Sequence, residues 1–151
     1  MSEDAIAYEP ALPSRKGRPA KSHDNARVRE VLSAWSVCEG SVAEDVADGC
    51  GDRWLSDILT GVSWLQTHGQ QSTRPLNSSL ILRVLVHCDS ITSEAVGRCI
   101  GRGLKRAQVD RYTAATRVAS KAIEAELDRR PQWVRQVLDD AAYFAELDVM
   151  L

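Results

Sequence analysis

The sequence has few of the features that mark secreted, membrane-spanning or zinc-binding proteins. It has no Cys-x-x-Cys pair among its four cysteines, which are Cys38, Cys50, Cys88 and Cys99. That spacing argues against a zinc site and favours reduced, mostly buried thiols. No apolar run reaches about 18 residues, the length that a membrane span needs, and the Met1 end lacks a secretory signal pattern. We therefore expect a protein of the bacterial cytoplasm or nucleoid, with no membrane partner and no metal.

The chemistry of an enzyme is also scarce. The three histidines, His23, His68 and His87, are far apart, and no glycine-rich phosphate loop, His-Glu-x-x-His motif or nucleophile elbow occurs. We expect no catalytic residues and no cofactor.

The chain is long enough for a substantial core, and its composition is that of a globular protein. It has 151 residues, of which 44% are hydrophobic and 26% are charged. Helical periodicity prevails along most of it, and we expect an all-α, multi-helix bundle with a flexible N-terminal arm. The expected parts are the arm 1–22, an N-terminal helical subdomain 23–66, a loop or hinge 67–77, and a unit 78–151 that contains a helix-turn-helix and the C-terminal helices.

The charge is segregated along the chain although the net charge is only −2. Residues 1–40 are neutral, 41–73 carry −4, 74–121 carry +6 and 122–151 carry −4. A basic block between acidic ones indicates a local face for a polyanion. A solvated surface matched to acidic neighbours in the fold is the alternative reading.

The arm contains a short basic motif. Arg15-Lys16-Gly17-Arg18-Pro19-Ala20-Lys21 resembles the core of an AT-hook, in which Gly-Arg-Pro lies in a narrow A·T-rich minor groove. The resemblance makes Arg15, Lys16, Arg18 and Lys21 candidate minor-groove contacts. A solubilising basic tail accounts for the motif equally well.

Three helical regions are expected to form the support. Ser22 is a suitable N-cap for a helix over 24–38, with an apolar stripe of Val28, Val31, Leu32, Trp35 and Val37. Residues 41–65 read as packing helices, although 41–61 also fits a second helix-turn-helix whose reading helix would be acidic. Residues 78–88 favour a helix, and their β-branched content also permits a buried strand.

The stretch from Thr92 to Lys121 is the most informative one. Thr92 is a good N-cap, and the apolar and small residues Val96, Gly97, Ile100 and Gly101 fit a first helix and its turn. Leu104, Val109 and Tyr112 fit the apolar positions of a second helix over 104–121. Between Arg98 and Lys121 seven basic residues face a single acid, Asp110. Over residues 78–123 the pattern resembles the helix-turn-helix of bacterial and phage transcriptional regulators, with a turn two residues longer than the tightest form.

The resemblance assigns roles to the second helix. Arg106 and Arg111 would bind guanine, Gln108 would bind adenine, and Asp110 would orient one of the arginines or accept from cytosine. Other basic residues would contact phosphates: Arg98, Arg102, Lys105, Arg117 and Lys121.

The remaining residues predict two more helical segments. The second helix is expected to continue over 114–127, with Ala115, Val118, Ala119, Ala122 and Ile123 facing inward. Pro131 suits the first turn of a last helix over 132–149. The stripe of that helix consists of Trp133, Val134, Val137, Leu138, Ala141, Phe144 and Leu147. It either closes the core or forms the seam of a homodimer, and we favour the dimer.

Together these features predict a sequence-specific protein for double-stranded DNA, a small transcriptional repressor of plasmid, phage or bacterial operon type. The alternative is a protein–protein interaction module, either adaptor or inhibitor, that uses its acidic helices and does not read DNA.

Overall fold

The protein is all-α, as expected. A computed structural model describes residues 23–39, 53–65, 74–101 and 103–150. They form the helices α1 (Ala26–Glu39), α3 (Arg53–Val62), α4 (Ser78–His87), α5 (Ser93–Ile100), α6 (Arg106–Arg129) and α7 (Pro131–Met150). The described residues contain no strand, only an isolated bridge between Asp24 and Ser90. None of their helices has the length and apolar character that a bilayer crossing requires.

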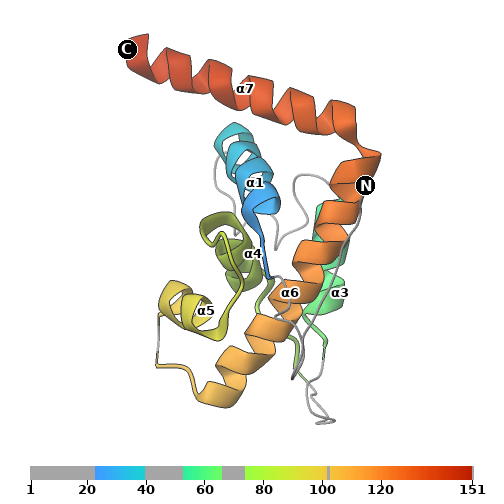
Figure 1. Ribbon diagram of the computed structural model, residues 1–151, viewed down its shortest axis with the longest axis vertical. Helices are drawn as coiled ribbons and strands as arrows, with labels where there is room; N and C mark the ends of the chain where they lie inside the picture. Colours follow the sequence, from blue (N-terminus) through green and yellow to red (C-terminus); the bar gives the residue numbers. More distant parts are fainter. Residues whose placement is uncertain (1–22, 40–52, 66–73, 102, 151) are drawn as a thin grey trace, which may run out of the picture.

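The long helix α6 is the centre of the arrangement. It contacts α1, α3, α4, α5 and α7. In Figure 1, α4 and α5 lie on one side of it and α3 on the other, while α7 crosses over α1 at the end opposite α5. Apart from Tyr112, the buried side of α6 is lined with small and medium-sized residues, which lets its neighbours approach closely. The buried residues of α6 are Tyr112, Thr113, Ala115, Thr116, Ala119, Ser120, Ile123 and Leu127.

Helices from both halves of the chain share one hydrophobic core. Trp35 of α1, Leu59 of α3 and Leu85 of α4 are at most 2% exposed and belong to the same cluster as Ile123 of α6. The expected subdomains 23–66 and 78–151 are therefore packed together. Of the expected hinge 67–77, residues 67–73 lie outside the described part, and Leu76 is buried with its N–H donated to the carbonyl of Ser63.

The helix starts and stops follow local side-chain chemistry. Residues 78–87 are helical, which resolves the helix-or-strand ambiguity, and the side chain of Asn77 accepts from the N–H groups of Ser79 and Leu80. Thr92 caps α5 as predicted, by accepting from the N–H of Ala95. At α1, Asp24 accepts from the N–H of Ala26, whereas the predicted cap, Ser22, lies outside the described residues.

Three apolar positions that the sequence places inside are on the surface. Val37 is 57% exposed, Val118 is 46% exposed and Phe144 is 42% exposed. Periodicity shows which face of a helix is apolar, but burial also requires a neighbour over that face. Among the described residues, such neighbours bury only the first half of α7, which packs on α1 and α6 through Trp133, Val134 and Val137.

One buried amide joins the start of α1 to the end of α4. Asn25 is 1% exposed. Its Nδ2 donates to the carbonyls of Leu85 (2.9 Å) and Cys88 (2.7 Å), and its Oδ1 accepts from the hydroxyl of Ser120 on α6 (2.7 Å). Its backbone N–H donates to the carbonyl of Asp89. The side chain thus satisfies carbonyls at the C-terminus of α4 that would otherwise lack a partner.

We predict that Asn25→Ala lowers the free energy of unfolding by about 3 kcal/mol, because it leaves two buried carbonyls and a hydroxyl without a partner. Ser120→Ala removes only one of these hydrogen bonds and should cost about 1 kcal/mol. Urea unfolding followed by circular dichroism measures both. Equal losses in the two variants would contradict the role assigned to the Asn25 amide.

Candidate nucleic-acid interface

Helices α5 and α6 lie in contact and are joined by a five-residue connection, 101–105. Val96 and Ile100 of α5 are buried, and Gly97 lies against Val109 of α6. A Cβ added at Gly97 would stand 4.0 Å from Val109 Cγ1, an ordinary contact, so alanine would also fit there. Gly101 ends α5 with a left-handed backbone (φ 62°), and Gly103 is also left-handed (φ 44°). A side chain at either glycine would strain this turn.

The second helix begins two residues later than predicted, at Arg106. Lys105 occupies the N-cap position with extended backbone and makes no side-chain capping hydrogen bond, and the first turn contains no acidic residue. The N–H groups of that turn therefore lack the side-chain acceptor that Thr92 supplies to α5. Together with Lys105 and Arg106 they form a positive helix end.

The first turn of α6 displays its polar side chains to solvent. Lys105, Arg106 and Gln108 are exposed. Arg106 Nε lies 3.2 Å from Asp110 Oδ1, and the two side chains are 80% and 36% exposed. Such an exposed pair contributes little to stability, and Arg106 remains able to exchange its partner. Asp110 also accepts from the hydroxyl of Ser93, at 3.4 Å, so α5 and α6 share this carboxylate.

Two arginines predicted to contact DNA hold the fold instead. Arg111 donates from Nε to the carbonyl of Leu65 (3.0 Å) and from Nη2 to those of Arg74 (3.0 Å) and Ser63 (3.5 Å). Arg117 donates from Nε to the carbonyl of Ile91 (2.9 Å). Both side chains are half-buried. Their guanidinium groups satisfy carbonyls near the end of α3 and before α5, so in this structure these donors are engaged within the fold and not directed at DNA.

Of the other predicted contacts, some lie on the surface and some lie outside the described residues. Arg98 on α5 and Lys121 on α6 are exposed. Lys121 lies about 22 Å along the axis from Arg106, at 1.5 Å per residue, and so is remote from the first turn of α6. Arg102 and the arm residues Arg15, Lys16, Arg18 and Lys21 lie outside the described residues.

The proposed second motif at 41–61 is only partly described. Its later part is α3, which buries Leu55, Leu59 and Val62 in the core. Trp54 of the same helix makes an edge contact with Trp133 (5.3 Å between centroids), and Arg130 stacks on its ring at 5.1 Å. This part of the region is a packing helix, and residues 41–52 lie outside the described part.

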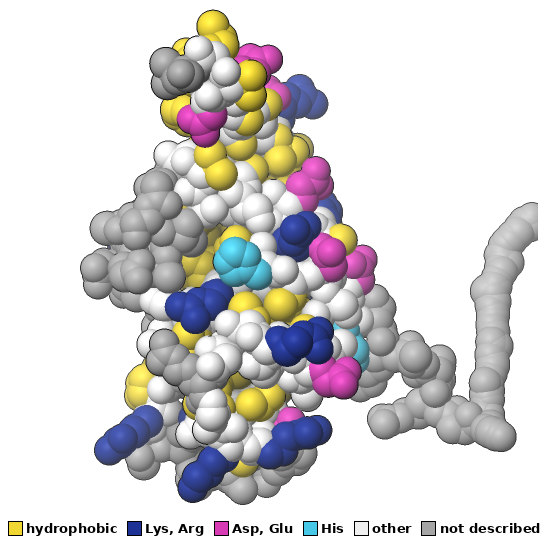
Figure 2. All heavy atoms as spheres, turned by 90° about the vertical axis from the view of Figure 1, so that its left-hand side faces the viewer, with side chains coloured by type: hydrophobic (Ala, Val, Ile, Leu, Met, Phe, Trp, Pro, Cys, Tyr) yellow, Lys and Arg dark blue, Asp and Glu magenta, His cyan; other side chains and the backbone are white. Residues whose placement is uncertain are grey.

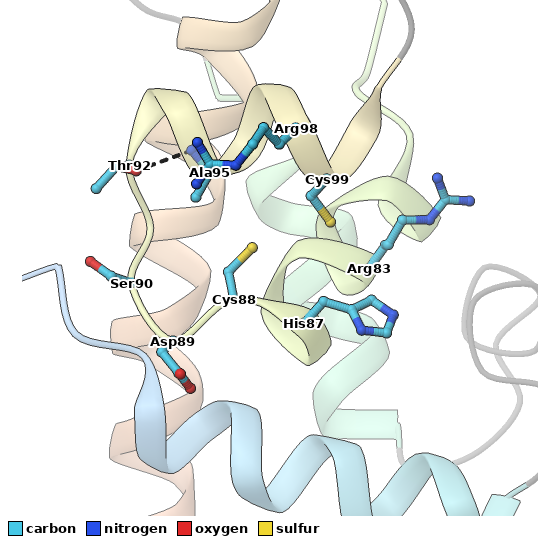
Figure 3. A pocket seen from close by; sticks show the side chains of 9 residues that line it. All are labelled: Arg83, His87, Cys88, Asp89, Ser90, Thr92, Ala95, Arg98 and Cys99. Atoms are coloured by element: carbon cyan, nitrogen blue, oxygen red, sulfur yellow. Dashed lines mark hydrogen bonds between the residues drawn. The ribbon is translucent and has the colours of Figure 1, made fainter.

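A hollow between α4 and α5 brings together residues that the sequence did not single out. It has a volume of about 720 Å³. As Figure 3 shows, Arg98 extends from α5 while Arg83 and His87 come from α4 on the other side, and the thiols of Cys88 and Cys99 lie between them. Arg83 and His87 are one helical turn apart and both exposed. The available signal was the i, i+4 spacing of two basic residues on the polar side of a helix that was expected only to support its neighbours.

The thiol of Cys99 in this hollow is a poor nucleophile. Burial, with a further contribution from the neighbouring Cys88, raises the pKa of the Cys99 thiol to about 11, and the charge of Arg83 acts in the opposite direction. Cys99 therefore stays protonated at neutral pH and forms a neutral floor. No group of three or more His, Cys, Asp or Glu among the described residues could hold a metal ion.

The exposed cations of α4, α5 and α6 gather on one side of the molecule. Figure 2 looks onto that side and shows several Lys and Arg side chains over its lower half, with few acids among them. The hollow between α4 and α5 and a second one between α5 and α6 share Arg98, and Arg106 lines the second. Arg83, Arg98 and Arg106 thus border two adjoining hollows on either side of α5.

Searches of protein-family models, of curated proteins and of solved structures found no match to this chain.

The two kinds of arginine on α6 should differ in their effect on stability. We predict that Arg111→Ala lowers the free energy of unfolding by about 2 kcal/mol, because its charge-assisted hydrogen bonds hold three carbonyls. Arg106→Ala should change it by less than about 0.5 kcal/mol, because its only described ion pair is exposed. Thermal and urea unfolding of the two variants measure this difference, and an equal loss in both would contradict the division.

Proposed function

We propose that this protein binds double-stranded DNA in a sequence-specific manner and acts as a small transcriptional repressor. The first turn of α6 would enter the major groove, with α5 lying across the backbone beside it. The observation that carries the proposal is the exposed, uncapped and cationic start of α6. This start follows a glycine turn and lies on the side of the molecule where the exposed cations gather.

Arg106 and Gln108 are the residues to read bases. A guanidinium group can donate two hydrogen bonds to guanine, and an amide can bind adenine in the same way. Asp110 holds Arg106 from one turn further along, at 3.2 Å, which limits the conformations of that long side chain before DNA arrives. Lys105 and Arg98 flank the turn and suit phosphates, which position a protein without specifying sequence.

The proposal is tested by binding to a labelled duplex selected from random DNA, over a series of salt concentrations. The affinity of the wild-type protein for the selected duplex should fall steeply as the salt concentration rises, and it should exceed the affinity for competitor DNA. Arg106→Ala with Gln108→Ala should reduce the preference for the selected site at least tenfold, since each lost base contact is worth about 1–3 kcal/mol.

Arg53→Ala is the matched control, because Arg53 is an exposed arginine of α3, on the other side of α6. This variant should keep the wild-type affinity for the selected duplex and the wild-type preference over competitor DNA. Wild-type protein that selects no sequence, or a double variant that keeps the full preference while folded, would refute the reading role of α6.

We further propose that the protein works as a homodimer through the second half of α7. Tyr143 is 58% exposed, Val149 87% and Met150 79%, and no described residue covers them. In Figure 1 this half of α7 extends beyond α1. A single short helix reads few base pairs, and a symmetric dimer doubles the contact through two half-sites. The same apolar surface is also what favours the alternative, an interaction module that binds a different protein.

Phe144→Glu should convert the dimer to a monomer, because it places a charge in the apolar surface. Light scattering after size exclusion measures the mass, and a two-half-site duplex should lose affinity in parallel. Gln132→Glu, at the exposed start of α7, controls for the added charge and should stay dimeric. A monomeric wild-type protein at micromolar concentration would contradict the homodimer and leave α7 to a different partner.

A further inference from the structure

The hollow between α4 and α5 carries positive charge that no described acidic residue balances. Among the described residues that line it, the only acid is Asp89, which lies 3.2 Å from Arg29 of α1 and is thereby paired. Arg83 and Arg98 make no ion pair with any described residue. The hollow is therefore bordered by two exposed guanidinium groups without a counter-charge among the described residues, which is an arrangement suited to an anion.

The shape of the hollow favours an extended anion over a small enclosed ligand. Arg83, His87 and Arg98 are exposed, and so are Asp89 and Ser90 at the loop end. Small-molecule sites usually enclose most of the ligand within apolar walls. This hollow is instead an open trough lined by the thiols of Cys88 and Cys99 together with Arg83, His87 and Arg98, as Figure 3 shows.

The trough adjoins the surface assigned to DNA. Arg98 borders it on one side of α5 and borders the α5–α6 hollow on the other side, where Arg106 lies. A backbone that passes over α5 from Arg106 therefore meets Arg98 next and Arg83 with His87 after it. The described acids that line the two hollows are Asp89 in the first and Glu94 in the second.

We propose that the trough between α4 and α5 is a second phosphate-contact site for the same DNA duplex, with Arg83 and His87 as contacts that add to Arg98. The inference rests on the proposed function, and it extends the DNA surface from α6 across α5 to α4. Arg83 supplies a permanent positive charge and His87 supplies a ring N–H donor. Both contact phosphates, so they add affinity without adding sequence preference.

The test compares wild-type protein with Arg83→Gln and with the control Arg53→Gln on the selected duplex. Arg83→Gln should reduce the slope of log affinity against log salt by about 0.9, the value for one lost phosphate contact. The loss of DNA affinity in Arg83→Gln relative to wild type should then shrink about threefold when the salt concentration rises fourfold. The preference for the selected site over competitor DNA should stay unchanged. Arg53→Gln should keep the wild-type slope, and all three proteins should melt at the same temperature.

The failures are distinguishable. If wild-type protein binds DNA, and Arg106→Ala with Gln108→Ala weakens its preference, an unchanged slope in Arg83→Gln overturns the phosphate site alone. If wild-type protein binds no duplex, the proposed function and the phosphate site both fail. If millimolar pyrophosphate raises the melting temperature of the wild type but not of Arg83→Gln, while the DNA slope is unchanged, the trough binds a small phosphate and the duplex contact is wrong.

Discussion

The buried side chain of Asn25 is the constraint that holds α1, α4 and α6 together. It joins the beginning of α1 to the last carbonyls of α4 and accepts from Ser120 in the middle of α6. All of its side-chain hydrogen-bonding atoms are used, which is the condition under which a buried amide contributes to a unique arrangement. The carbonyl of His23, two residues before Asn25, accepts a hydrogen bond from the N–H of Ile91. The loop that leads into α5 is thus held from the side of α1.

This anchoring explains why the cations of α6 have two different roles. Arg117 donates to the carbonyl of Ile91 from the opposite side of the same loop, and Arg111 does the same for the end of α3. Bends and loops around a central helix leave carbonyls without helical partners, and guanidinium groups with several donors satisfy them well. Apart from Arg74 and Lys121, the described basic residues of 74–121 that remain exposed lie at the start of α6 and on α4 and α5. They make up a smaller but more coherent surface than the charge count of residues 74–121 indicates.

The proposed DNA surface therefore depends on the packing of the helices as much as on their charge. The glycine turn after α5 lets α6 begin without a cap, and its first turn projects beside α5. Because α4 packs against the other side of α5, Arg83 joins the same surface although it is 23 positions away from Arg106 in the chain. The second half of α7 lies at the opposite end of the molecule in Figure 1, so the proposed pairing of two copies there would leave the start of α6 accessible.

The sequence by itself determined the helical character of the chain, the cap at Thr92, the glycine turn at Gly101 and the start of α7 at Pro131. These features depend on local backbone preferences and on hydrogen bonds within a few residues, which a linear reading captures. Only the tertiary structure decided which charged and apolar side chains are free. In the sequence Arg111 and Arg117 look like surface cations, but in the structure they donate hydrogen bonds to carbonyls that are distant in the chain. Helical periodicity places Val118 and Phe144 in the core, but in the structure both side chains are exposed. Periodicity likewise makes Arg83 part of a supporting helix, and the packing of α5 against α4 places it beside Arg98. Exposure and hydrogen-bond partners depend on segments far away in the chain, and helical periodicity contains no information about those segments.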